Sequence, residues 1–503
     1  MSLDFLNDVP EFKDLIRALE KSEKGLRISG LAPPSKPFFF SSLAQRLPRR
    51  IIYIQPAEYS LTRFEERSGF FFSELGSAKH AKALPALTEN PYQETAPSLE
   101  AVSSRMRLFY DLLYRMPALI ITNLFGLLRP FPGPDRLARL FLRLEKNLFY
   151  DRDKLLETLA GYGYVREDLI SFRGEYAGRG GIVDVFSPWQ NVPCRVEYSG
   201  DEIVSLREFD SSTQRSLRRQ ESILIPSLLE AAGPDEASVP FTRYLEDPVF
   251  VIDHLDDVGK EWDDARKELQ DREEALDIYP PSLWDEIREK AVIVEDLEIT
   301  KARKVFHFPF QSVPRFKNRI PFFLDAMRRL QRERDRCYIY LTSPAIRKKI
   351  AGLLAQNEVE CREADTPLAA PKSGELMLLL GDLGQGFSYP REKISFFAET
   401  DIITEEKVVL SRPSVRPTLT QFQDLKAGDY VVHADYGVGI FQGLLKMDVD
   451  GNPREFMGLR YRDDDKLFVP VEDLNLVQKY ARVGAASACV TRRASIFLSS
   501  RKI

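Results

Sequence analysis

The sequence predicts a multidomain α/β protein: a parallel sheet interrupted by an inserted α+β domain, a small second α/β domain, and a small β-barrel. Strand and helix patterns alternate over roughly the first 120 residues, which favours a parallel sheet with helical crossovers. Short strands joined by tight turns replace this alternation at residues 181–209 and again at residues 424–480. The 503-residue chain is also too long for one core and fits roughly three to four domains.

The first sheet is predicted from apolar strands that are separated by helices. Residues 38–47 have the pattern of a helix, and residues 51–54 form a buried strand that Pro56 ends. Residues 118–122 supply a second apolar strand. At residues 249–254 the chain returns to an apolar strand that is followed by a long charged helix. We therefore expect the first sheet to resume there, after the insertion.

The insertion is predicted from three short strands at residues 181–186, 194–198 and 203–209, with a Ser-Gly-Asp-Glu turn between the last two. A strand–helix–strand order from about Phe316 onward predicts the second α/β domain. In the last domain, Asp450-Gly451 is a strong hairpin signal.

The predicted organisation assigns a range to each part of the chain. The ranges are 1–128 and 227–315 for the two halves of the interrupted α/β domain, 129–226 for the insertion, 316–410 for the small α/β domain, 411–420 for a linker, 421–480 for the barrel, and 481–503 for an unstructured or aberrant tail.

Composition limits the function classes. The net charge of −5 provides no global positive field for nucleic acid, although a local basic face is compatible with it. The four cysteines and four histidines show no metal-ligand spacing, which argues against a structural zinc site or a disulfide framework. The N-terminus is charged and amphipathic, and no uncharged apolar run reaches about 18 residues. We expect a soluble cytoplasmic protein with no membrane partner and no metal.

The stretch "SGLAPPSKPFFFSSL" contains an altered phosphate-binding loop. From Gly30 it reads Gly-x-x-x-x-Ser-Lys-Pro, where a working loop reads Gly-x-x-x-x-Gly-Lys-Ser/Thr. Lys36 is present, but Ser35 replaces the second glycine and Pro37 replaces the hydroxyl that holds magnesium. Two more prolines in the stretch remove further N–H donors. The pattern is either coincidental or the remnant of a nucleotide site.

A second sequence feature favours the remnant. The strand "VFVIDH" ends in Asp253, where nucleotide hydrolases place a magnesium-binding carboxylate, and His254 stands where such sites usually have a glutamate. An aspartate that ends a buried strand is often only structural. The two features lie in the expected order and on the expected elements, so we interpret them as an eroded site that does not hydrolyse nucleotide.

The remaining candidates are binding surfaces, because the chain has no Gly-x-Ser-x-Gly, no His-Glu-x-x-His and no cysteine paired with a plausible histidine. Arg179 is flanked by glycines, and Arg195 lies on the next predicted strand near Tyr198. Arginine and tyrosine are typical interface anchors. The alternative is that both arginines are ordinary solvated surface residues.

The segment "REFMGLRYR" in the predicted barrel has apolar side chains on both faces. Alternation puts Met457, Leu459 and Tyr461 on one face and Phe456, Gly458 and Arg460 on the other. Such a strand suits an edge that accepts a strand from another protein. The alternative is an ordinary core strand.

Several segments together resemble the bacterial transcription-repair coupling factors. "GRGGIVDVFSPWQNVPCRVEYSGDEIVSLREFDSSTQRSL" is similar to the second domain that this family shares with the repair protein UvrB, and "LKAGDYVVHADYGVGIFQGLLKMDVDGNPREFMGLRYRDDDKLFVPVEDLNLVQKY" is similar to its CarD-like domain. "LPALTENPYQETAPSLEAVSSRMRLFYDLL" and "GELMLLLGDLGQGFSYPREKISFFAETDII" also resemble the family. The resemblance covers roughly residues 20 to 480.

The resemblance implies a degenerate, helicase-like UvrB module that has lost nucleotide hydrolysis and serves as a docking platform. It implies that the insertion recruits the repair ATPase UvrA through two arginines, which fall on Arg179 and Arg195, and an aromatic residue. The aromatic position falls on Ser199, and Tyr198 beside it substitutes only if its strand register allows.

For the CarD- and Tudor-like barrel, the resemblance implies a contact with the β subunit of RNA polymerase by edge-strand pairing. The contact residues would be Glu455, Phe456, Met457, Gly458, Leu459, Arg460 and Tyr461, with Met457 and Leu459 as its apolar part.

One departure from the family concerns the motor. Family members continue into an ATP-dependent DNA translocase and a C-terminal regulatory domain, whereas this sequence ends at Ile503. We expect a truncated or frameshifted reading frame or a split gene, a monomer with no enzymatic activity, and no cofactor, because ATP and Mg²⁺ would serve the absent motor. DNA would be a partner only in the full-length context. The alternatives are an ATP-dependent DNA helicase and a stand-alone CarD-type transcription regulator.

Overall fold

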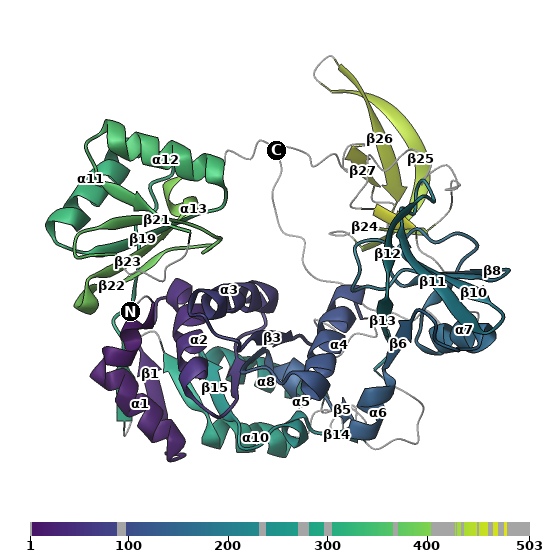
Figure 1. Cartoon of the computed structure of the whole chain (residues 1–503), viewed down its shortest axis with the longest axis horizontal. Coiled ribbons are helices and arrows are strands. Elements are labelled where there is room, and N and C mark those ends of the chain that lie inside the picture. The colour runs from purple at the N-terminus through teal and green to yellow at the C-terminus, as the bar shows by residue number, and fades with distance from the viewer. Residues whose placement is uncertain are drawn as a thin grey trace. The chain divides into compact units, whose positions relative to one another are not determined.

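A computed structural model gives the fold of the chain, which separates into two compact units, Met1–Thr404 and Glu405–Ile503 (Figure 1). The structure describes residues 3–87, 97–230, 238–269, 281–295, 304–365, 371–403, 428, 430–433, 437–449, 452–460, 466–470 and 477–479.

The first unit contains a seven-stranded parallel sheet. Its order is β17 (Lys304–His307), β1 (Leu26–Ser29), β16 (Val292–Glu295), β15 (Val249–Asp253), β2 (Ile51–Ile54), β4 (Leu119–Thr122) and β3 (Ala81–Leu84). Its strands are short apolar runs because helices cover both faces. Strand β15 pairs in parallel with β2, so the prediction that the first sheet resumes after the insertion is confirmed.

Side-chain alternation along the strands divides this sheet between two cores. On β2, Tyr53 points into one hydrophobic cluster and Ile54 into the other; on β15, Val251 and Ile252 divide in the same way. The first cluster is covered by α1 (Pro10–Glu20), α2 (Lys36–Arg46) and α3 (Leu61–Glu74), and the second by α4 (Leu99–Tyr114), α5 (Leu124–Leu128), α8 (Leu255–Leu269) and α10 (Pro281–Lys290). Helix α2 confirms the predicted helix and begins two residues earlier than expected.

The insertion is built on a six-stranded sheet. Its order is β12 (Ser216–Gln220), β11 (Glu202–Phe209), β10 (Cys194–Ser199), β9 (Ile182–Val185), β8 (Glu175–Arg179) and β7 (Val165–Arg166), with α7 (Arg152–Gly161) on one face. The three predicted strands are β9, β10 and β11, whereas β8 and β12 were not predicted. Two short strand pairs lie between the first sheet and the insertion sheet in the chain: β5 (Phe131–Pro132) pairs with β14 (Ser238–Val239), and β6 (Phe141–Glu145) pairs with β13 (Ser222–Pro226). The short helix α6 (Pro134–Arg139) lies between β5 and β6.

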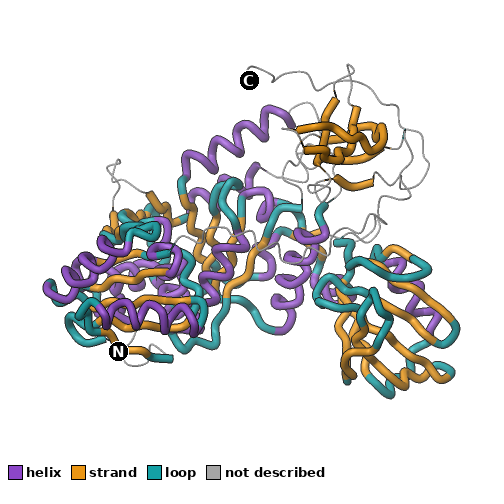
Figure 2. The backbone as a smooth tube through the Cα atoms, turned by 90° about the horizontal axis from the view of Figure 1, so that it is seen from above, coloured by secondary structure: helices purple, strands orange, loops and turns teal. Residues whose placement is uncertain are grey.

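The small α/β region contains a mixed six-stranded sheet. Its order is β18 (Gln311–Ser312), β22 (Phe387–Tyr389), β23 (Ile394–Ala398), β19 (Arg336–Leu341), β21 (Leu376–Leu380) and β20 (Cys361–Glu363), with α11 (Ile320–Arg332), α12 (Pro344–Gln356) and α13 (Glu399–Ile402). The tube in Figure 2 shows its helices and strands beside those of the first sheet. Phe387 and Phe396 share a core with Phe38 of α2, which joins the two sheets into one unit.

The second unit is an antiparallel sheet with the order β27 (Lys466–Pro470), β26 (Asn452–Arg460), β25 (Gly437–Val449), β24 (Tyr430–His433) and β28 (Val477–Lys479). Val449 of β25 pairs antiparallel with Asn452 of β26, in agreement with the predicted hairpin, while Asp450 and Gly451 lie outside the described residues. Among the described strands, β27 and β28 are the ends of the sheet and do not pair with each other. The expected barrel closure is therefore not observed in the described residues.

A buried arginine ties the first sheet to the end of the insertion. Arg105, on α4, is fully buried and forms an ion pair with Glu230, just beyond β13. Its other donors go to the carbonyls of Pro85 and Gly126, and its guanidinium lies 5.0 Å from the ring centroid of Phe131.

We predict that Arg105→Met lowers the free energy of unfolding by about 3–5 kcal/mol, because it leaves Glu230 without its buried partner. Urea unfolding of the whole chain measures the change. The control is Arg17→Met, which removes an exposed ion pair with Asp14 and should cost no more than about 1 kcal/mol. Equal losses in the two variants would contradict the prediction.

Candidate partner-binding site

One face of the insertion sheet brings Arg179 and Arg195 together around a buried carboxylate. Asp184, on β9, is opposite Ala177 of β8 and opposite Arg195 of β10, and Arg179 is two residues farther along β8. Alternation therefore places Arg179, Asp184 and Arg195 on the same face. The carboxylate of Asp184 accepts hydrogen bonds from Nε and Nη2 of Arg195 at 2.7 and 2.8 Å, and Nη2 of Arg179 lies 3.6 Å from it.

The two arginines differ in how firmly they are held. The Arg195 side chain is 16% exposed, donates a further hydrogen bond of 2.8 Å to Gln214, and lies 4.4 Å from the ring centroid of Phe209. Its hydrogen bonds to Asp184 raise the pKa of its guanidinium, against the opposing effect of burial. The Arg179 side chain is 54% exposed. The face therefore presents one fixed cation and one that reaches into solvent.

Tyr198 does not belong to this face. It follows Cys194 and Val196 at two-residue intervals and packs against the same hydrophobic cluster, on the side of the sheet that faces α7. Its hydroxyl is buried and has no hydrogen-bond partner among the residues that the structure describes, and burial raises the pKa of the phenol. The register does not allow Tyr198 to act as the aromatic anchor beside Arg195. Ser199 is exposed at the end of β10.

Further residues on this face were missed: Arg207 lies on the predicted strand β11 but was not singled out, and β12 and the loop before β8 were not recognised. Arg195 pairs with Arg207 of β11, which pairs with Arg219 of β12, so three arginines form a row across the sheet. Arg207 forms an ion pair with Glu197, while Arg219 is exposed. The signal in the sequence was the recurrence of arginine in "SLREF" and "SLRRQ".

The same face carries a small apolar cluster and an exposed aromatic residue. Ile170, Ala177, Phe186 and Phe209 pack together beside the arginines. The loop that supplies Ile170 also presents Phe172, whose exposed fraction is 60%. Arginines next to an exposed aromatic side chain are the composition expected of an interface centre.

The residues of the altered phosphate loop do meet in space. Nζ of Lys36 donates hydrogen bonds of 2.8 and 3.0 Å to the two carboxylate oxygens of Asp253, and the hydroxyl of Tyr53 donates one of 2.5 Å. Lys36 and Asp253 are both buried, and Nε2 of His254 lies 3.3 Å from Nζ. The lysine that would contact phosphate is thus bound to the aspartate that would contact magnesium.

The loop itself has the wrong backbone for a phosphate cradle. Ser35 donates both its N–H and its hydroxyl to the carbonyl of Ala32, within the 3-10 turn Pro33–Ser35, and Pro37 lies in the first turn of α2 without an N–H. Gly30 has φ +80°, and a Cβ there would lie 2.6 Å from the carbonyl oxygen of Phe308. Prolines remove three N–H donors from the stretch, and the N–H groups of Ser35 and Lys36 are bonded within the turn.

The segment expected to contact polymerase is not an edge strand over most of its length. Residues Phe456–Arg460 of β26 pair with β25 on one side and with β27 on the other, so that part of the prediction is wrong. Met457 and Leu459 are fully buried, Gly458 is buried, Phe456 is partly buried and Arg460 is exposed. The backbone of Glu455 lies just beyond the end of β27, and Tyr461 lies outside the described residues.

In the described ranges, no cluster of three or more histidine, cysteine, aspartate or glutamate side chains could hold a metal ion. A search of the same ranges finds no helix that combines the length and the apolar character needed to cross a membrane.

Comparisons with known proteins place two of these regions in families. Residues 142–228 match the UvrB interaction domain, and residues 425–481 match the CarD-like/TRCF RID domain. The chain is 22% identical to the transcription-repair-coupling factor of Bacillus subtilis over 95% of its length, 24% identical to that of Myxococcus xanthus over 93%, and 24% identical to that of Staphylococcus haemolyticus over 95%. It spans 46–47% of the length of these relatives. The resemblance to coupling factors is confirmed.

We predict that Lys36→Met lowers the free energy of unfolding by about 3–5 kcal/mol, because Asp253 would stay buried without its counter-ion. We also expect MgATP to leave the thermal midpoint of the unaltered chain unchanged, since a ligand that binds the native state would raise it. Thermal and urea unfolding with and without MgATP test both points.

The control for this variant is Lys24→Met, which removes an exposed ion pair with Glu289. If MgATP raises the thermal midpoint of the unaltered chain but not that of Lys36→Met, Lys36 binds nucleotide, and the purely structural role of the Lys36–Asp253 pair is wrong.

Proposed function

Proceeding from this similarity, we propose that the chain serves transcription-coupled nucleotide-excision repair by docking on the β subunit of RNA polymerase and recruiting UvrA. The observation that supports this most is the presence in one chain of a UvrB interaction domain at residues 142–228 and a CarD-like domain at residues 425–481. The first domain offers an arginine-rich face, and the second offers a sheet with a protruding hairpin.

The UvrA contact is assigned to the face around Asp184. Arg179 is its accessible cation, and Arg195 is held in place behind it. Phe172 takes the aromatic role that the family assigns to the position of Ser199, because it is exposed on the loop beside this face whereas Tyr198 packs on the other side of the sheet. Interface centres of this kind depend on a few aromatic and arginine anchors.

The proposed role does not involve nucleotide hydrolysis by the Lys36–Asp253 site. Its lysine and aspartate bind each other, and the turn Pro33–Ser35 uses its donors internally. The rival function, an ATP-dependent DNA helicase, requires these groups to be available for phosphate and magnesium. A stand-alone CarD-type regulator is a second rival and would not use the UvrA face.

The polymerase contact is assigned to the β25–β26 hairpin where it extends beyond β27. Residues Asn452–Glu455 of β26 pair with β25, and no described strand pairs with their other side, which is therefore our candidate edge for a partner strand. Leu445, on β25, is 43% exposed and pairs with Phe456. Met457 and Leu459 support this surface from the core, since both are fully buried.

We predict that Arg179→Ala and Phe172→Ala each weaken UvrA binding by about 2 kcal/mol or more, because each removes an accessible anchor without unpairing a buried charge. Titration of each variant with purified UvrA, monitored by calorimetry or interferometry, measures the loss of binding free energy. Arg143→Ala, at an exposed ion pair with Glu145 on β6, is the matched control and should change nothing measurable.

UvrA binding at full strength in both variants would rule out this face. Arg195→Ala is not a clean test, because it leaves the buried Asp184 without its principal partner and should destabilise the insertion as well.

We predict that Leu445→Arg reduces capture of RNA polymerase by at least about tenfold, since it places a charge at the apolar part of the hairpin surface. Gln442→Arg, at an exposed polar position of the same strand, introduces the same side chain and should leave capture unchanged. Pulldown with purified polymerase measures both. Equal capture by the two variants would move the contact away from the hairpin.

A further inference from the structure

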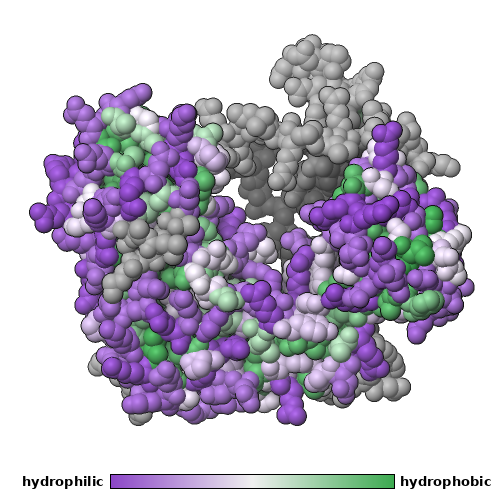
Figure 3. Space-filling view, viewed as in Figure 1, coloured by the Kyte–Doolittle hydropathy of each residue, from purple (hydrophilic) through white to green (hydrophobic). Residues whose placement is uncertain are grey.

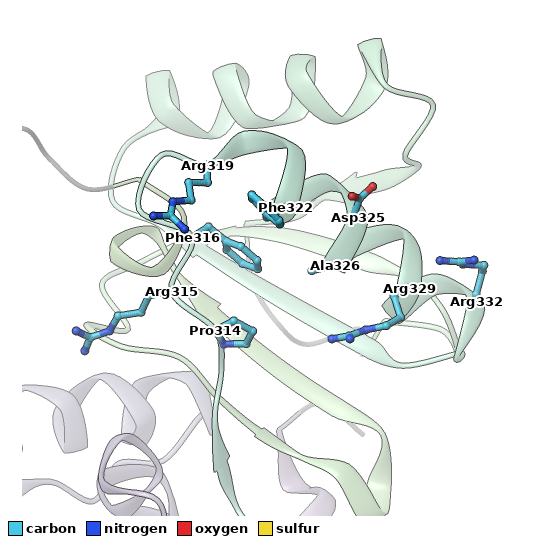
Figure 4. Close-up of a pocket in the computed structure, with 9 residues that line it drawn as sticks. All are labelled: Pro314, Arg315, Phe316, Arg319, Phe322, Asp325, Ala326, Arg329 and Arg332. Carbon is cyan, nitrogen blue, oxygen red and sulfur yellow. The ribbon is translucent and has the colours of Figure 1, made fainter.

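The small α/β region has a groove that neither matched domain contains. The groove lies between α11 and the segment at residues 314–316 and has a volume of about 500 Å³ (Figure 4). It is lined by Pro314, Arg315, Phe316, Arg319, Phe322, Asp325, Ala326, Arg329 and Arg332. In this part of the molecule, Figure 3 shows hydrophobic surface bounded by hydrophilic side chains.

The groove is positively charged. Four arginines and one acidic residue line it, and that residue, Asp325, already forms an ion pair of 3.3 Å with Arg328. Among the described residues, Arg315, Arg319 and Arg329 form no ion pair, although Arg315 interacts electrostatically with Asp401 and Arg329 with Asp335. A local excess of guanidinium groups over carboxylates in the groove lining, on a chain of net charge −5, favours an anionic ligand at this place.

An exposed aromatic ring lies between the cations. Phe322 is 64% exposed, whereas Phe323, Leu324 and Met327 of the same helix are buried in the core. Phe322, Ala326 and Arg329 recur at helical spacing along the solvent side of α11. Phe316 forms part of the floor and packs edge-on against Phe323. Phe322 thus offers an open ring face rather than a deep apolar pocket.

The arginines form two groups at the two ends of the groove. Figure 4 shows Arg315 and Arg319 at one end and Arg329 and Arg332 at the other, with Phe322 between them. Along α11, the ten to thirteen residues from its N-cap Arg319 to the second group correspond to about 15–20 Å. At about 3.4 Å for each stacked nucleotide, this distance matches roughly four to six nucleotides of one strand.

We propose that this groove binds single-stranded nucleic acid, with phosphates at the two arginine groups and a base stacked on Phe322. Guanidinium groups match phosphate with paired N–H donors, and an aromatic platform accepts any base through its π face. An acidic peptide would also satisfy the arginines, but it would gain little from a protruding ring without a pocket. The proposal is independent of polymerase and UvrA binding.

The test is fluorescence anisotropy of a labelled oligodeoxythymidylate of about a dozen nucleotides with the full chain. Binding should weaken steeply between about 50 and about 200 mM salt. Phe322→Ala should weaken binding about tenfold and leave the salt slope unchanged, since it removes stacking alone. Arg319→Glu with Arg329→Glu should weaken binding more than tenfold and lower the slope by about 1.4, since each lost phosphate contact contributes about 0.7.

The matched control reverses two exposed arginines elsewhere, Arg166→Glu with Arg266→Glu, which changes net charge equally. If the control loses as much oligonucleotide binding as the groove variant, the loss is explained by the change in net charge, and the proposal is overturned. Absence of binding at about 50 mM salt would overturn it too. A third outcome would also overturn the proposal: poly-glutamate binds in a way that requires Arg319 and Arg329, while the oligonucleotide does not bind. The groove would then accept an acidic polypeptide and not a nucleic acid.

Discussion

The buried ion pair between Lys36 and Asp253 is the constraint on which the first unit depends. The lysine follows β1 and the aspartate ends β15, so the pair joins residues 217 positions apart and closes the carboxyl edge of the parallel sheet. Two charges this deeply buried are unfavourable unless each is fully hydrogen-bonded. The hydroxyl of Tyr53 donates to Asp253, and the imidazole of His254 lies within hydrogen-bond distance of Lys36. The chain leaves the sheet from β4 and returns into β15, two strands that flank β2, and the pair lies at the end of the strand into which the chain returns.

The same constraint explains why α2 is a structural helix. In a phosphate-binding loop, the helix that follows must leave its N-terminal donors open to the ligand. Here, the turn Pro33–Ser35 closes on itself, and α2 is buried from Lys36 to Ala44. Phe38 contacts Phe387 and Phe396 across the joint core, with ring centroids 5.5 and 5.8 Å apart. The closed turn Pro33–Ser35 and the packing of the small α/β sheet on α2 are therefore linked. That sheet covers α2 on the side from which a ligand would approach a working loop.

The sequence predicted those parts of the fold that are encoded by contiguous apolar runs. The strands at residues 51–54 and 249–253 were recognised because both faces of each are buried. Lys36 and Asp253 were assigned to one eroded site from their order in the chain and their elements, but the ion pair between them was not predicted. The neighbours of a strand in its sheet could not be predicted from the sequence of that strand alone. The pattern around Leu459 is compatible with an edge and with a core strand, and only the position of β27 decides between them. The face of the sheet on which Tyr198 lies depends on the register of β10. Arg219 could not be placed because its strand, β12, is too polar to be recognised in the sequence.

The arrangement around Asp184 determines what kind of partner can bind the insertion. Asp184 neutralises most of the charge on Arg195, so the face presents its accessible positive charge through Arg179 and Arg219. A partner carboxylate would meet Arg179 first, because its side chain is mostly exposed and its contact with Asp184 is long at 3.6 Å. Arg195 contributes in another way: its fixed guanidinium keeps Asp184 from repelling an acidic partner and holds Phe209 beneath it. An arginine that is already hydrogen-bonded loses little side-chain entropy on binding, so this face is organised before a partner arrives.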